Sequence, residues 1–148
     1  MRAILQRVDS ASVEIDGSIH SRIDEGLLVL VGFEEEDTEE DLQWVTKKIT
    51  QLRVFNDQDR VMNRSIVDVD GELLIVSQFT LHASIKKGNR PSYIKAAKPD
   101  KAILLYERFK LICKLMLNCE SGVFGADMKV NLVNNGPVTI SIDSKRKE

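Results

Sequence analysis

The sequence is poor in the residues that carry most enzyme chemistry. Its 148 residues include two histidines, two cysteines and one tryptophan, and aromatic residues make up 5% of the chain. No Gly-rich phosphate loop, zinc-ligand spacing or dinucleotide fingerprint is present, so no motif requires a metal ion or a cofactor. The histidines are His20 and His82. One histidine beside Thr80 does not supply the nucleophile, base and acid of a conventional hydrolase.

The chain also lacks the segments that direct a protein into a membrane or out of the cell. No apolar stretch approaches the ~18 residues of a membrane span, and no basic segment followed by an apolar run opens the chain. We therefore expect a cytosolic protein. Cys113 and Cys119 match neither a redox C-x-x-C motif nor a metal-ligand spacing. We expect both to be inert thiols.

Charge is distributed unevenly along the chain. The formal net charge of -2 opposes binding of nucleic acid over the whole surface, because Lys and Arg dominate phosphate binding. Residues 34–41 contain seven acids, whereas residues 86–101 contain six basic residues and the single acid Asp100. The second segment is therefore expected to form a local basic patch, although a solvated lysine-rich loop would have the same composition.

Length and periodicity predict one α+β domain over residues 1–148. An apolar content of 43% suits a single core. Segments rich in β-branched residues predict strands, and Asp16-Gly17 and Asp70-Gly71 are hairpin signals that favour an antiparallel sheet. The expected strands cover residues 2–8, 12–15, 18–23, 27–33, 61–69, 72–81, 128–132 and 138–142.

Two segments have apolar residues at helical spacing. The first helix is expected to begin at a cap on Asp37 or Thr38 and to end near residues 56–60, and the second to begin at Pro99. Both are expected to pack on an antiparallel or mixed sheet, or on a partly closed barrel. The Asn-Asn-Gly-Pro sequence at 134–137 predicts a break between the last two strands.

Two short motifs resemble the signature motifs of the D-aminoacyl-tRNA deacylase family. They are Ser77-Gln78-Phe79-Thr80-Leu81 and Asn135-Gly136-Pro137-Val138-Thr139. The resemblance continues in order and spacing through the start of the chain and through the region between the motifs. It includes Met1-Arg2-Ala3, Gln6-Arg7-Val8 and residues 87–92, 105–107 and 124–128. The similarity therefore covers essentially the whole chain, but it assigns no role to His82.

The resemblance implies a homodimeric enzyme that hydrolyses the ester bond of D-aminoacyl-tRNA as a proofreading step in translation. Its two sites would lie at the subunit interface. Each would be lined by one chain's strand end and by the other chain's Gly-Pro loop, that is, by Ser77, Gln78, Phe79 and Thr80 and by Gly136 and Pro137. Backbone N–H groups around Gln78 and Phe79 would stabilise the oxyanion. Arg7 would brace the loop.

The same resemblance suggests how the site would act. The Gly136-Pro137 bond is expected to be cis, which only X-Pro bonds adopt at modest cost. The loop carbonyls would hold the α-amino group, so that an L side chain would clash with backbone whereas glycine would not. Thr80 would shape the pocket without being acylated, because the ribose hydroxyl of the substrate can take part in the reaction. Lys86, Lys87 and Arg90 would contact tRNA phosphates.

Simpler interpretations of these residues stay open. Gly136-Pro137 is compatible with an ordinary turn, Thr80 with a surface β-branched residue and Phe79 with a core aromatic. The basic stretch also fits a non-catalytic RNA-binding module, although Tyr93 is its single aromatic residue. A third possibility is a hydrolase of small D-amino-acid esters or amides, for which tRNA is irrelevant.

Overall fold

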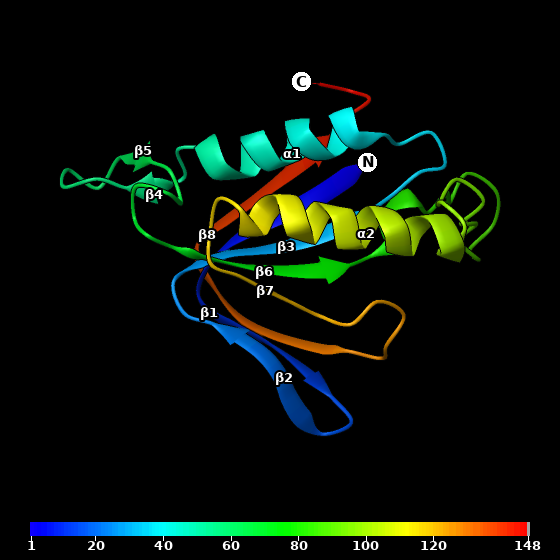
Figure 1. The fold of residues 1–148 in the computed structure, drawn as a ribbon, viewed down its shortest axis with the longest axis horizontal. Coiled ribbons are helices and arrows are strands. Elements are labelled where there is room, and N and C mark those ends of the chain that lie inside the picture. Colours follow the sequence, from blue (N-terminus) through cyan, green and yellow to red (C-terminus); the bar gives the residue numbers. More distant parts are fainter. Residues whose placement is uncertain (148) are drawn as a thin grey trace.

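Two helices lie together over one face of a curved sheet in the computed structural model, which describes residues 1–147 (Figure 1). The helices are α1, Glu39–Gln51, and α2, Pro99–Lys114, and a short 3-10 helix, η1, covers Phe79–His82. The strands are β1 Arg2–Ile15, β2 Ser18–Ile23, β3 Gly26–Gly32, β4 Phe55–Asn56, β5 Met62–Arg64, β6 Glu72–Ser77, β7 Cys119–Ser121 and β8 Lys129–Asp143. No helix within the described residues is long and apolar enough to cross a bilayer.

The main sheet is mixed and nearly closes into a barrel. Its strand order is β2-β1-β3-β6-β7, and β8 pairs with β1 along almost the whole length of that strand. The β3–β6 and β6–β7 pairs are parallel, whereas β1 is antiparallel to β2, β3 and β8. The α+β class with a mixed, partly closed sheet is therefore confirmed.

The central strands β3 and β6 are buried on both faces against apolar side chains. On β3, Leu27, Val29 and Val31 face the helices, whereas Leu28 belongs to a second core. That second core forms where the β1–β2 hairpin and the first part of β8 curl over the opposite face (Figure 1). The continuous apolar run at 27–33 is thus explained by burial on both faces.

Several local expectations are wrong. The strand expected over residues 61–69 is limited to β5, and the strand expected over 72–81 ends with β6 at Ser77. Asp70 has a positive φ of 53° and Gly71 follows it, but this turn does not form a hairpin, because β5 pairs with β4 and β6 lies between β3 and β7. Helix α1 ends at Gln51 rather than near 56–60, since Val54 and Phe55 leave the helix to enter the core. Thr38 is the N-cap of α1.

Buried polar groups tie α2 to the sheet. The Tyr106 hydroxyl lies 2.9 Å from the Ile75 carbonyl oxygen and 3.1 Å from that of Gly122, and burial raises the Tyr106 pKa. Both cysteines are free and buried. Burial raises the pKa of Cys113 to about 12 and that of Cys119 to about 11, so both thiols are protonated near neutral pH.

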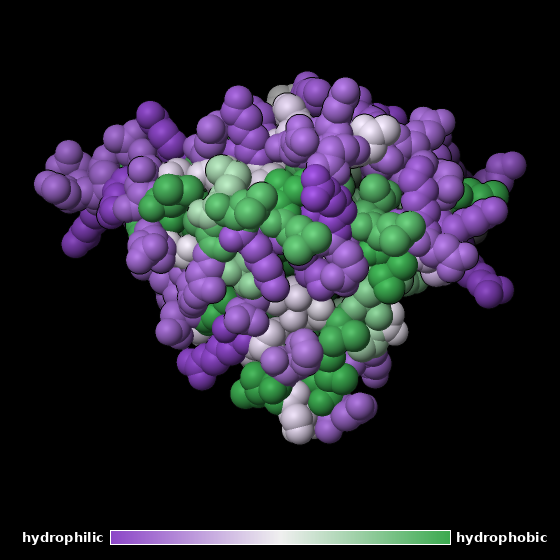
Figure 2. All heavy atoms as spheres, in the orientation of Figure 1, coloured by the Kyte–Doolittle hydropathy of each residue, from purple (hydrophilic) through white to green (hydrophobic). Residues whose placement is uncertain are grey.

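The outward face of α2 is partly apolar. Leu104, Leu111 and Leu115 are exposed along it, by 71%, 57% and 87%. Figure 2 shows apolar patches across the middle of this face of the molecule, with polar side chains over α1 above them.

Candidate active site

The motif Ser77–Thr80 lies where β6 ends. Ser77 pairs with Val31 of the parallel strand β3, and the Gln78 N–H donates a hydrogen bond of 2.7 Å to the Val31 carbonyl oxygen. The chain then turns into η1. A 3-10 helix leaves its first N–H groups without an internal acceptor, and within residues 1–147 no hydrogen bond takes up those of Phe79 and Thr80. The N–H of Gln78, by contrast, is already used by the sheet.

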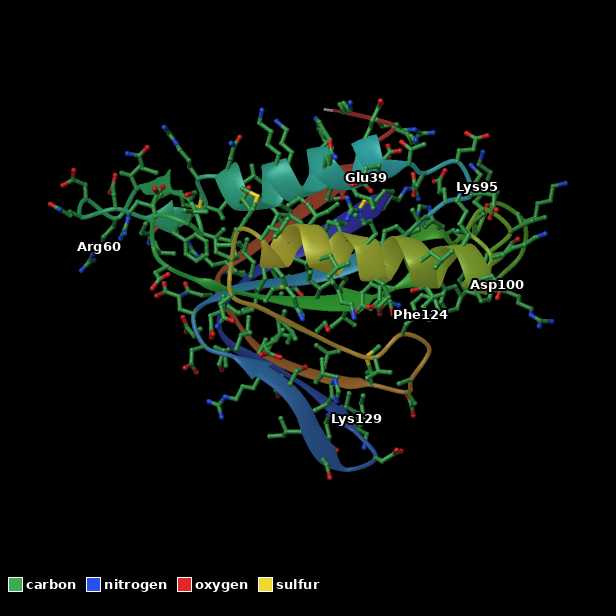
Figure 3. All side chains as sticks on the ribbon, in the orientation of Figure 1. Glu39, Arg60, Lys95, Asp100, Phe124 and Lys129 are labelled. Atoms are coloured by element: carbon green, nitrogen blue, oxygen red, sulfur yellow. The ribbon has the colours of Figure 1, made fainter. Side chains whose placement is uncertain are left out.

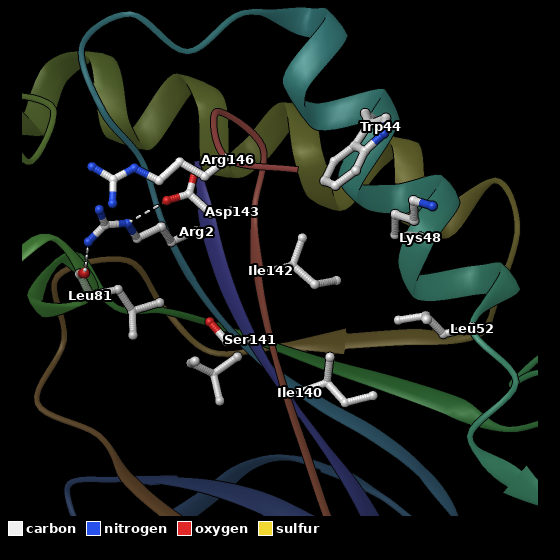
Figure 4. A pocket seen from close by; sticks show the side chains of 11 residues that line it. Arg2, Trp44, Lys48, Leu52, Leu81, Ile140, Ser141, Ile142, Asp143 and Arg146 are labelled. Carbon is white, nitrogen blue, oxygen red and sulfur yellow. Dashed lines mark hydrogen bonds and ion pairs between the residues drawn. The ribbon is translucent and has the colours of Figure 1, made fainter. Parts of the chain in front are cut away.

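Arg2 fixes the position of this turn. Its Nη1 donates to the Leu81 carbonyl oxygen at 2.9 Å, and its Nε donates to Asp143 Oδ2 at 3.0 Å (Figure 4). The Arg2 guanidinium and a backbone hydrogen bond from Lys145 keep the pKa of Asp143 low even though partial burial acts against this. The turn is therefore tied to both β1 and β8 through one guanidinium group.

The side chains of the motif differ in exposure and partners. Gln78 Nε2 donates to Thr80 Oγ1 at 2.5 Å, and this amide is the only partner of the hydroxyl among the described residues. Phe79 is 57% exposed and meets Tyr93 edge to face, with ring centroids 4.9 Å apart. Phe79 is therefore not a core residue. Within residues 1–147 the Thr80 hydroxyl makes no hydrogen bond to a titratable base.

The basic stretch extends from the same end of the molecule. Hydrogen bonds of 2.8 and 2.9 Å between the backbones of Ser84 and Ser92 fold the chain back on itself. The exposed Lys86, Lys87 and Arg90 lie between these two residues, and no ion pair within residues 1–147 involves them. Figure 3 shows Lys95 and Asp100 at this end of the molecule, far from Arg60 and Lys129.

Residues 135–138 bulge out of β8. Thr139 pairs with Gln6 and Asn134 with Val8, so four residues of β8 are opposite Arg7 alone. The sequence predicted a break between two strands here, but one strand continues through the bulge because β1 pairs with it on both sides. The Gly136–Pro137 peptide bond in the bulge is cis.

Arg7 holds this loop from inside the protein. The residue is 7% exposed, and its guanidinium binds only neutral oxygen atoms among the described residues. Nη1 donates to the Val54 carbonyl oxygen at 2.6 Å, while Nε and Nη2 donate to the carbonyl and side-chain oxygens of Asn135 at 3.3 and 3.1 Å. A Cβ on Gly136 would lie 2.9 Å from Arg7 Nη2, and Gly136 has a φ of 118°. Glycine at this position thus allows the loop to approach the guanidinium.

The two motifs do not meet within one chain. Ser77 of β6 pairs with Val31 of β3, which pairs with Ala3 of β1. The Gly136 loop of β8, by contrast, lies opposite Arg7 of β1. Four residues of β1 separate the two positions, which is about 13 Å at ~3.3 Å per residue. The structure therefore brings Ser77, Gln78, Phe79 and Thr80 together at one end of the sheet and leaves Gly136 and Pro137 at the other.

A cavity of about 510 Å³ lies between the motifs, along the edge of β8 and beside α1 (Figure 4). Arg2, Asp143 and Arg146 lie together at one end of it. Its apolar wall consists of Ile4, Trp44, Leu52, Leu81, Ile140 and Ile142. Sequence reasoning missed this cavity and the role of Arg2. The alternation of Ile140 and Ile142 near the C-terminus was the only sequence signal of the cavity.

The comparison with known proteins covers both motifs. The family model described as D-Tyr-tRNA(Tyr) deacylase matches residues 4–143. The chain belongs to the D-Tyr-tRNA(Tyr) deacylase family. Relatives named D-aminoacyl-tRNA deacylase from Parabacteroides distasonis and Bacteroides fragilis are 59% and 58% identical to it over their full lengths and over all of this chain.

Solved structures resemble this deacylase-family chain over almost its whole length. A structure titled c-Myc DNA Unwinding Element Binding Protein has a TM-score of 0.92 at 38% identity, covering 97% of this chain and 98% of that one. A second, titled as a probable eukaryotic D-amino acid tRNA deacylase, has a TM-score of 0.83 at 18% identity over 95% and 97% of the two chains. The second likeness concerns the fold alone.

Arg7→Lys tests the anchoring of the loop. Lysine keeps the charge, but its three N–H donors sit on one nitrogen and cannot reproduce the planar spread by which Nε, Nη1 and Nη2 of Arg7 reach Asn135 and Val54 from different sides. We expect the free energy of unfolding, measured in urea, to fall by about 1–3 kcal/mol. Amide hydrogen exchange should become faster in residues 134–138.

Arg22→Lys is the matched control, because Arg22 is 63% exposed and its only ion-pair partner within residues 1–147, Asp24, is 3.8 Å away. Equal stability and equal exchange in the two variants would show that Arg7 does not hold the loop.

Proposed function

We propose that this protein hydrolyses the ester bond of D-aminoacyl-tRNA to give the free D-amino acid and tRNA. The observation that carries the proposal is the strand end at Ser77–Thr80, which forms an anchored turn with free N–H groups beside an exposed Phe79. Membership in the deacylase family supports the same reaction. The substrate belongs to translation, so the protein acts in the cytosol.

The turn supplies electrostatic stabilisation rather than a nucleophile. Water adds to the ester carbonyl, and the N–H groups of Phe79 and Thr80 donate to the developing oxyanion. As the ester bond breaks, the neighbouring ribose hydroxyl gives its proton to the leaving ribose oxygen and takes up the proton that the attacking water loses, so that the free D-amino acid and intact tRNA are formed. The Thr80 hydroxyl is held by Gln78 and has no base beside it, so it shapes the pocket without forming an acyl intermediate.

The site is completed by a second copy of the chain. Along β1 the two motifs are level with Ala3 and Arg7, so the midpoint between them is Leu5. Leu5 pairs with Ile140, which lies in the wall of the cavity. Within the described residues β8 pairs only with β1, so its other edge is open to another chain. A two-fold axis near this midpoint would bring each Gly136-Pro137 loop to the partner's strand end. This geometry supports a homodimer with two shared sites.

Chirality would be read by the backbone of the loop. In this arrangement the carbonyls around Gly136 and Pro137 bind the α-amino group of the substrate, and Arg7 keeps them in place. A D side chain then points away from the loop, whereas an L side chain meets it. Rejection by a backbone clash does not depend on which side chain is present. Glycyl-tRNA, which has no side chain, escapes the clash.

Hydrolysis of matched D- and L-aminoacyl-tRNA is the direct test of activity. We expect loss of the D-ester and retention of the L-ester, with a free D-amino-acid ester turned over much more slowly because it lacks the tRNA contacts. Rapid hydrolysis of the free ester would favour a hydrolase of small D-amino-acid derivatives. Binding of tRNA without hydrolysis of either enantiomer would favour a non-catalytic RNA-binding module.

Lys87→Glu tests the contact with tRNA. If the loop that carries Lys86, Lys87 and Arg90 binds phosphates, the variant should raise KM for tRNA. It should also reduce the salt dependence of log KM by roughly one unit of slope per lost contact. Lys129→Glu is the control, since Lys129 is 78% exposed and lies far from this loop (Figure 3). Identical salt dependence in the two variants would remove the loop from the tRNA-binding surface.

A further inference from the structure

His82 is a buried histidine at the end of η1, directly after the candidate site. The residue is 1% exposed. Its Nδ1 lies 2.9 Å from Glu34 Oε1, but off the direction in which the ring N–H would donate a hydrogen bond. Its Nε2 has no hydrogen-bond partner among the described residues. The contact with Glu34 is therefore a close approach without hydrogen-bond geometry.

The ring lies against Gly32 at the end of β3. A Cβ on Gly32 would be 2.6 Å from the Gln78 carbonyl oxygen, 3.1 Å from His82 Cδ2 and 3.3 Å from His82 Nε2. Only glycine leaves this space free. Gln78, just before η1, and His82, its last residue, therefore both lie close to β3 at Gly32. The imidazole ring therefore lies between the turn and the sheet, and it is one of the groups, with Arg2, that hold the turn there.

Glu34 is itself fixed. Its N–H donates to Asp37 Oδ2 at 2.7 Å, and its backbone pairs with that of Ala96 in an isolated antiparallel bridge. The side chain of Glu34 is 25% exposed, so the carboxylate stays partly hydrated while it faces His82. The contacts from Asp37 to Glu34 and from Glu34 to the imidazole link the start of α1 to the turn.

Stability does not explain a histidine at this position. A buried polar ring with incomplete hydrogen bonds costs free energy, and an apolar side chain of similar volume avoids that cost. Groups of this kind persist where they serve function. The function at hand is the orientation of the N–H groups of Phe79 and Thr80, which are part of the same turn.

We propose that His82 is a positioning residue of the deacylase. Its ring, held between Gly32 and Glu34, fixes η1 and thereby the two N–H groups that stabilise the oxyanion, without touching the substrate. The proposal rests on the proposed function. Because a small misplacement of donor groups affects the transition state more than substrate binding, kcat depends on His82 and KM does not.

His82→Leu separates positioning from a structural role. On D-aminoacyl-tRNA we expect kcat to fall about tenfold or more while KM stays within about twofold. The urea midpoint should be equal to that of the wild type or higher, because an unpaired polar ring is replaced by an apolar side chain. His82→Gln keeps a donor and an acceptor and should retain more of kcat. Glu34→Gln should lower kcat with little change in stability.

His20→Leu is the matched control, because His20 is exposed on β2 and the chemical change is the same. Hydrogen exchange of residues 77–83 gives a readout that does not require activity. It should be faster in His82→Leu and unchanged in His20→Leu. Unaltered kcat in His82→Leu, or a loss of kcat that follows a fall in stability, would overturn the proposal.

The two proposals can fail separately. Faster exchange of residues 77–83 in an enzyme whose wild type hydrolyses no D-aminoacyl-tRNA would support the positioning of the turn and overturn the deacylase function. Unchanged exchange with an active wild type would overturn the role of His82 alone.

Discussion

The pairing of β1 with β3 on one side and with β8 on the other fixes where both signature motifs lie. One register places Ser77 level with Ala3, and the other places the bulge at 135–138 level with Arg7. Neither motif can move along the sheet without breaking a ladder of backbone hydrogen bonds. Two arginines of β1 complete the arrangement, since Arg2 binds the turn after β6 and Arg7 binds the loop in β8. A single strand therefore positions both parts of the proposed site.

Elements that depend on local chemistry could be predicted from the sequence. The Asp16-Gly17 hairpin, the doubly buried β3 and the start of α2 at Pro99 follow from turn preference, an apolar run and the fixed φ of proline. The parallel pairing of β6 could not be predicted, because Asp70-Gly71 has the composition of a hairpin turn and the partners of β6 are remote in sequence. At Asp70-Gly71 the local preference for a hairpin conflicts with the long-range pairing of β6 with β3 and β7, and the long-range pairing determines the structure.

The candidate site was predicted from resemblance to a family rather than from residue chemistry. No residue of Ser77–Thr80 is a strong acid, base or nucleophile, so rules based on side chains give no signal for them. Their contribution lies in a backbone turn whose geometry depends on Arg2, Gly32 and His82. An activated ester needs less from its enzyme than an amide does, and fixed donors are an effective way to supply it. The cavity beside β8 could be found only once the strand pairing was known.

Sharing of each site between two chains is the central claim, and mixed dimers test it most directly. Phe79→Pro removes an N–H donor at a position that suits proline, and Gly136→Val displaces the loop because its Cβ would meet Arg7 at 2.9 Å. Each homodimer should be inactive. A purified heterodimer of the two variants has one site with both parts intact, so we expect about half of the wild-type activity on D-aminoacyl-tRNA. A heterodimer as inactive as its parents, or a fully active monomer, would contradict the shared site.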